Sequence, residues 1–128
     1  MAATEVVYVP SPDRSRASGG QTSGMTRTNA ISGKASINAS IMTAAPHSSS
    51  GIHHHGEQDT IIYSLKGRGS VISEGGKKRQ DIGPGDFLLI PKGVEHQEVN
   101  DSDEEVVWVI TRSGTEADVQ NVDGWAGP

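Results

Sequence analysis

The chain has 128 residues, a formal net charge of −5, no cysteine and 33% hydrophobic residues. This length suits one domain with a modest core, and the lack of cysteine excludes disulfides, iron–sulfur clusters and thiolate zinc sites. The acidic balance argues against nucleic acid and anionic membrane surfaces as partners. Because no apolar run approaches a membrane span and no basic, apolar leader begins the chain, we expect a cytoplasmic protein.

Residues 1–24 are expected to form a strand followed by a flexible arm. Residues 5–9, Glu-Val-Val-Tyr-Val, are mostly β-branched or aromatic and are stopped by Pro10. The stretch 10–24 is rich in Pro, Ser, Gly and Arg, which indicates a loop or arm. A strand on such an arm could be exchanged with a second chain.

Short apolar segments recur through the rest of the chain, separated by turns that contain Gly or Pro. The predicted strands are 25–32, 36–43, 60–65, 69–73, 79–82, 87–91, 96–99 and 105–111. No segment of useful length has the i, i+3, i+4 spacing of an amphipathic helix. This pattern predicts an all-β, single-domain antiparallel barrel over residues 25–113, with a polar tail at 114–128.

Three of the five histidines are consecutive, at positions 53 to 55. Residues i and i+2 of a strand point to the same face, so His53 and His55 can converge on one point while His54 faces away. His96 begins a later strand, directly after a Pro-Lys-Gly-Val-Glu turn, and is the best candidate for a third metal ligand. Histidines with open positions beside them suit Fe, Mn, Ni, Co or Zn.

These residues resemble the two motifs of the cupin superfamily. The second motif matches at Gly85, Pro91, Gly93, His96 and Asn100, and the first at His53, His55 and Gly67. The resemblance covers about residues 40 to 111. It implies a double-stranded β-helix, or jelly roll, that holds one divalent transition metal (Fe, Mn, Ni or Zn), and a small cupin that pairs as a homodimer.

The glutamate of the first cupin motif has no clear counterpart. Counting back from Gly67 reaches Thr60, whereas counting on from His55 reaches Asp59. Either Asp59 coordinates the metal, or Thr60 faces inward and water completes a three-histidine site; Glu57 is a third possibility. The predicted metal ligands are His53, His55, Asp59 and His96.

The resemblance implies a metal-dependent enzyme that acts on a small organic substrate. With Fe(II) and O₂ it would be a dioxygenase, the version we favour here; with Mn, Ni or Zn it would be an isomerase, lyase or hydrolase. Glu98, on the same face as His96, and Glu57 are the candidate catalytic residues that would move protons. The alternatives are a non-catalytic binding module or a structural metal, and the lack of a helical pattern for a DNA-binding domain favours an enzyme over a transcriptional sensor.

Overall fold

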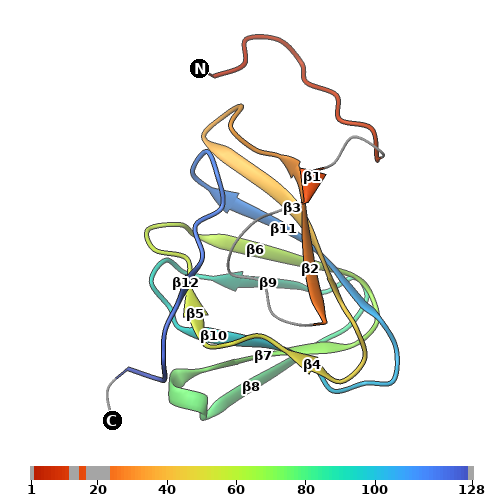
Figure 1. Ribbon diagram of the computed structural model, residues 1–128, viewed down its shortest axis with the longest axis vertical. Coiled ribbons are helices and arrows are strands. Elements are labelled where there is room, and N and C mark those ends of the chain that lie inside the picture. Colours follow the sequence, from red (N-terminus) through yellow and green to blue (C-terminus); the bar gives the residue numbers. More distant parts are fainter. Residues whose placement is uncertain (1, 12–14, 17–23, 127–128) are drawn as a thin grey trace.

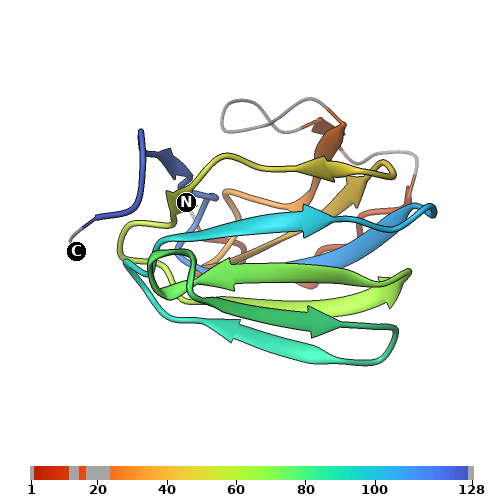
Figure 2. The same cartoon turned by 90° about the horizontal axis from the view of Figure 1, so that it is seen from below.

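Two antiparallel sheets form the barrel of the computed structural model, which describes residues 2–11, 15–16 and 24–126 (Figure 1). The first sheet has the order β1 (Ser15–Arg16), β2 (Met25–Ile31), β3 (Ile37–Ala44), β11 (Val106–Ser113), β6 (Thr60–Lys66) and β9 (Phe87–Ile90). The second has the order β12 (Gln120–Asn121), β5 (His53–His54), β10 (His96–Asn100), β7 (Gly69–Ser73) and β8 (Lys78–Ile82), with β4 (Ser48–Ser49) also paired to β10. Figure 2 shows β10, β7 and β8 lying side by side.

All the strands predicted from residue 25 onward are present, within about two residues of the expected ends. The described ranges contain no α-helix, and the turn after β7 is a single 3₁₀ turn, Glu74–Gly76. No helix in the described part of the chain is long and apolar enough to cross a membrane. The all-β prediction is therefore confirmed.

The N-terminal segment at residues 5–9 forms no strand within its own chain, and its predicted exchange with a second chain stays a prediction. Residues 5–9 form no strand in the structure and run outside the two sheets (Figure 1). Val6 and Tyr8 are 99% and 83% exposed, so they bury no apolar surface that would hold an extended strand in place. The rest of the predicted arm, at 12–14 and 17–23, lies outside the described residues.

Buried and half-buried residues alternate strictly along β11, and this strand runs from the apolar core to a polar end of the barrel. Its buried positions are Val106, Trp108, Ile110 and then Arg112. Trp108 lies opposite Met42 and Ser64 in the core, whereas Arg112 lies opposite Asn38 and Thr60. Because residues i and i+2 of a strand share a face, one strand supplies both core and pocket side chains.

Asn100 of the second motif and Gly67 of the first have structural roles. Asn100 is buried, and its amide nitrogen donates to the carbonyl oxygens of Ala44, Ala45 and Glu104 at 3.1, 3.0 and 2.8 Å. Gly67 of the first motif has φ +76°, and a Cβ there would lie 2.5 Å from the Glu105 carbonyl oxygen. These residues close turns at the end of the barrel remote from the histidines.

The outer face of the first sheet is unusually apolar. Phe87 and Leu89 of β9 are 70% and 61% exposed, and Ile61 and Leu65 of the adjacent β6 are also exposed. The rings of Tyr63 and Phe87 pack with their centroids 4.9 Å apart. Contiguous exposed apolar surface of this kind is typical of a protein–protein contact.

Candidate metal centre

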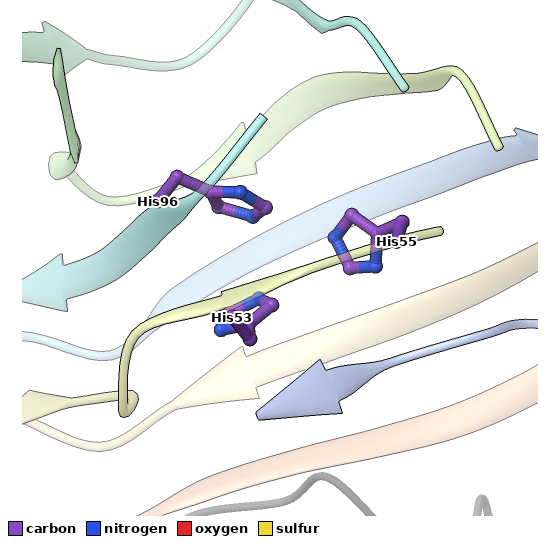
Figure 3. A group of neighbouring side chains, drawn as sticks. All are labelled: His53, His55 and His96. Atoms are coloured by element: carbon purple, nitrogen blue, oxygen red, sulfur yellow. The ribbon is translucent and has the colours of Figure 1, made fainter. Parts of the chain in front are cut away.

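The second sheet brings the three predicted histidine ligands together. His53 of β5 and His96 of β10 are direct antiparallel partners, and His55 follows two residues after His53. All three side chains are buried, and one nitrogen of each lies within 4.8 Å of those of the other two. Figure 3 shows the three rings gathered around one small space. The His-x-His pairing predicted from strand geometry is confirmed.

Backbone carbonyl groups orient each ring in the same way. The Nδ1 atoms of His53, His55 and His96 lie 2.9, 3.0 and 3.0 Å from the carbonyl oxygens of Gly51, Asp118 and Val94. A carbonyl oxygen can only accept a hydrogen bond, so each Nδ1 carries the proton and donates. Each neutral ring therefore keeps the lone pair of its Nε2 for another ligand, which is the arrangement that metal-binding histidines use.

Burial keeps the rings of His55 and His96 neutral. Burial, together with the nearby positive charge of Arg112 and the imidazole of His96, lowers the pKa of His55 to about 2. Burial also lowers the pKa of His96, although the Glu98 carboxylate opposes this. Neutral imidazoles are ready to bind a cation without first losing a proton.

One buried histidine nitrogen without a hydrogen-bond partner indicates that the site fits a metal. The Nε2 of His96 is buried and has no hydrogen-bond partner in the described part of the chain. A buried polar atom without a partner costs free energy, and a metal ion bound by the three Nε2 atoms would remove that cost. Three nitrogen ligands with open positions suit a divalent transition metal, and His53, His55 and His96 would hold it.

The acidic residues after the histidines lie outside this group. Asp59 is exposed, and its Oδ1 accepts a hydrogen bond from the Lys92 backbone nitrogen at 3.0 Å. Glu57 is also exposed. Thr60 is fully buried and points inward, as the second of the two alternatives from the sequence required. Adjacent strand residues face opposite ways, so an inward Thr60 turns Asp59 outward.

Glu98 lies inside the barrel, as its spacing from His96 predicted. It is 8% exposed, and its Oε1 is 3.6 Å from the Nε2 of His53. It lines a pocket with both His53 and His55. Its carboxylate thus lies beside one of the nitrogens that would bind the metal.

Sequence reasoning missed two arginines that line the same pocket, Arg27 of β2 and Arg112 of β11. Arg112 is 3% exposed, and its Nη2 lies 3.4 Å from the Nε2 of His55. The alternation along β11 could have revealed Arg112, but the predicted strand ended at residue 111. The pattern around Arg27 gave no comparable signal.

The C-terminal segment, predicted to be a polar tail, takes part in the site. Its strand β12 pairs with β5, and the Asp118 carbonyl oxygen accepts from His55. The Gln58 side chain also holds this segment, because its Oε1 accepts from the Asp118 backbone nitrogen at 2.8 Å. The tail thus closes one side of the pocket, where Val119 lines it.

The other two histidines serve elsewhere. His54 accepts a hydrogen bond from the Gly56 backbone nitrogen at 3.1 Å through its Nδ1, which keeps it away from the cluster. His47 is exposed and its Nε2 lies 2.6 Å from Asp103 Oδ1. Neither belongs to the three-histidine group.

The pocket beside the histidines is lined by both polar and apolar side chains. It encloses about 390 Å³ of empty space, including the part open to solvent. The polar lining residues include Ser50, the two histidines, Glu98 and the two arginines. The apolar lining residues are Met25, Met42, Ile110 and Val119. This lining suits a small ligand that has both polar and apolar atoms.

Two facing antiparallel sheets with three inward histidines define a jelly-roll barrel with a candidate metal centre. The family described as "Cupin domain" matches residues 40–112, and the chain belongs to this family.

A protein of Aquifex aeolicus (strain VF5), described as an uncharacterized protein, is 40% identical over 58 residues. That match covers 45% of this chain and 46% of the relative, so it spans about half of either protein. Among solved structures, the polyketide cyclase RemF from Streptomyces resistomycificus has a TM-score of 0.77 and 21% identity, covering 97% of this chain and 90% of that one. An oxalate oxidase has a TM-score of 0.70 and 20% identity, covering 83% of this chain and 59% of that one. At these identities the two structures show a shared fold.

Proposed function

We propose that this chain is a metal-dependent enzyme that acts on a small organic substrate bound beside His53, His55 and His96. The observation that carries the proposal is that three buried imidazoles converge with their Nδ1 atoms already bonded to backbone carbonyl oxygens. This leaves three Nε2 lone pairs for one cation. A metal bound there would act as a Lewis acid towards a substrate oxygen.

The chain's own residues supply binding and proton transfer. Glu98, almost fully buried beside the cluster, can hold or move a proton at Oε1. Arg112 and Arg27 offer hydrogen-bond donors and positive charge to an oxygen-bearing group. Met25, Met42 and Ile110 add apolar surface to the lining of the pocket. Glu57, the other proton carrier expected from the sequence, is exposed and plays no part in this proposal.

Two versions of the chemistry follow from this arrangement, addition of O₂ with Fe(II) and non-redox isomerase, lyase or hydrolase chemistry. We now favour the non-redox version, because the carboxylate of Glu98 is the kind of group that moves a proton to or from carbon. The printed names of the similar structures, a cyclase and an oxidase, are compatible with either version.

Elemental analysis of untagged protein would test the metal part of the proposal. We expect close to one transition-metal ion per wild-type chain, loss of that ion in His96→Ala, and retention in the control His54→Ala, whose ring points away from the cluster. Iron would favour the oxygenase version, whereas Zn, Ni or Mn would favour the non-redox version. No metal in the wild type, and none taken up from added salts, would refute the proposal.

The proton-transfer part needs a separate measurement. Small oxo acids and hydroxy acids incubated with metal-loaded protein in D₂O would be followed by NMR for deuterium uptake at carbon. We expect Glu98→Gln to keep its metal and to lose this exchange. Equal exchange by wild type and Glu98→Gln would remove Glu98 from the mechanism.

A further inference from the structure

Arg112 is a buried cation with unused hydrogen-bonding capacity. Its side chain is 3% exposed, and neither Nε nor Nη1 has a hydrogen-bond partner within the part of the chain that the structure describes. Its Nη2 has one long contact, at 3.4 Å, to the Nε2 of His55. A metal on that nitrogen would take the lone pair that Nη2 now faces, so the whole guanidinium group would then lack an acceptor.

Leaving a guanidinium group in this state is costly. The guanidinium group of an arginine stays charged at neutral pH even when it is buried. A buried charge normally has a hydrogen-bonded partner of opposite sign. Since the pocket walls do not supply one to Nε and Nη1, a bound ligand is the natural source.

The charges of the groups around the pocket cancel, so a bound divalent metal would leave an excess of positive charge. Arg27 and Arg112 each contribute +1, and Glu98 and Asp118, the two acids whose charges act on Arg112, each contribute −1. These four charges cancel, so a divalent metal would bring the total to +2. An anionic ligand would compensate this excess, whereas a neutral ligand would not.

We propose that the pocket selects a small carboxylate whose neighbouring carbon carries a carbonyl or hydroxyl oxygen, and that Arg112 is the residue that binds the carboxylate. Two donors of a guanidinium group match the two oxygens of a carboxylate, which gives both affinity and orientation. The carbonyl or hydroxyl oxygen on the neighbouring carbon would then face the three Nε2 atoms, because Arg112 Nη2 is in contact with one of them. The substrate's apolar remainder would pack on Met42 and Ile110. This inference deepens the proposed function and rests on it.

The test compares pyruvate with pyruvamide, which has nearly the same shape but no charge. Calorimetric titration of metal-loaded wild type should show pyruvate binding about tenfold or more tightly, since a buried charge-assisted pair is worth that much or more. In Arg112→Gln the preference should fall to within about threefold, with metal content unchanged. Arg112→Lys should keep part of the preference, because it retains the charge but not the paired donors. Arg79→Gln is the matched control, since it removes a surface arginine that binds Asp81 and Asp101 and should leave the preference as in wild type.

Several outcomes would overturn the inference. They are the absence of saturable pyruvate binding, equal affinities of the wild type for the two compounds, and an undiminished preference in Arg112→Gln. If Arg112→Gln does not fold or does not hold its metal, the wild-type comparison and Arg112→Lys still decide the question. If the wild type takes up no metal, the proposed function fails, while the same comparison in metal-free protein still shows whether Arg112 selects a carboxylate.

Discussion

Mild acid should destabilise the metal-free protein through its buried histidines. An exposed histidine in the unfolded chain has a pKa of about 6.5, whereas burial lowers the pKa of His55 in the folded protein to about 2. Below pH 6.5 the unfolded chain therefore binds a proton that the folded protein cannot. The free energy of unfolding must fall as the pH falls, down to the pKa of the folded state.

The size of this effect follows from the two pKa values. Between pH 7 and pH 5, protonation of one such histidine in the unfolded chain lowers the free energy of unfolding by about 2 kcal/mol. His96 adds to the loss, because burial lowers its pKa as well. A typical domain is stable by only about 5–15 kcal/mol, so a loss of this size is easily measured.

Urea denaturation of chelator-treated protein at pH 7 and pH 5 would measure it. His55→Gln removes the titrating group, so its stability should fall by about 2 kcal/mol less than that of the wild type over this interval. The control His54→Gln leaves the three-histidine group intact and should behave like the wild type. Identical pH dependence in all three proteins would refute the reasoning.

Saturating metal should raise the stability at pH 7, and this gain should shrink on acidification as protons compete for the imidazoles.

Three further predictions concern the rest of the molecule. Asn100→Ala should cost about 3 kcal/mol in urea denaturation, because three carbonyl oxygens lose the same buried donor; a loss below about 1 kcal/mol would contradict this. Thr60→Val and Asp59→Asn should each leave metal affinity, measured by competition with a chelating dye, within about threefold of wild type, since neither side chain belongs to the histidine group; a large loss in either would identify a fourth ligand. The chain should be a homodimer that buries the exposed apolar face around Phe87 and Leu89, and Phe87→Lys should shift it to a monomer in analytical ultracentrifugation; a wild-type monomer would refute this.

The strands and two of the three histidine positions could be predicted because each depends on local alternation. A strand needs only a period of two and a turn at each end, and His53 and His55 share a face by the same rule. The contact between His96 and His53 depends on sheet pairing between distant segments. Its prediction therefore rested on the spacing of a known motif.

The remaining parts of the site depend on register, which short segments do not reveal. Whether position 59 or 60 faces inward is decided by where the β6 strand begins, and one residue reverses the answer. The strand β12 has two residues, too few for any periodic pattern, yet it places the Asp118 carbonyl oxygen on His55. Arg112 stands one residue beyond the predicted end of its strand, at the boundary where such predictions are least accurate.

Position 60 connects the missing motif carboxylate with the charge of the pocket. Counting back from Gly67 puts the glutamate of the cupin motif at position 60, and Thr60 lies directly opposite Arg112 across β6 and β11. A glutamate there would sit beside the guanidinium group and compensate its charge, and it would also reduce the positive charge at a metal bound nearby. Threonine carries no charge, so the charges of the guanidinium group and of a bound metal are left for the ligand to compensate. The departure from the motif and the unpaired arginine thus have one physical consequence, a pocket that favours an anion.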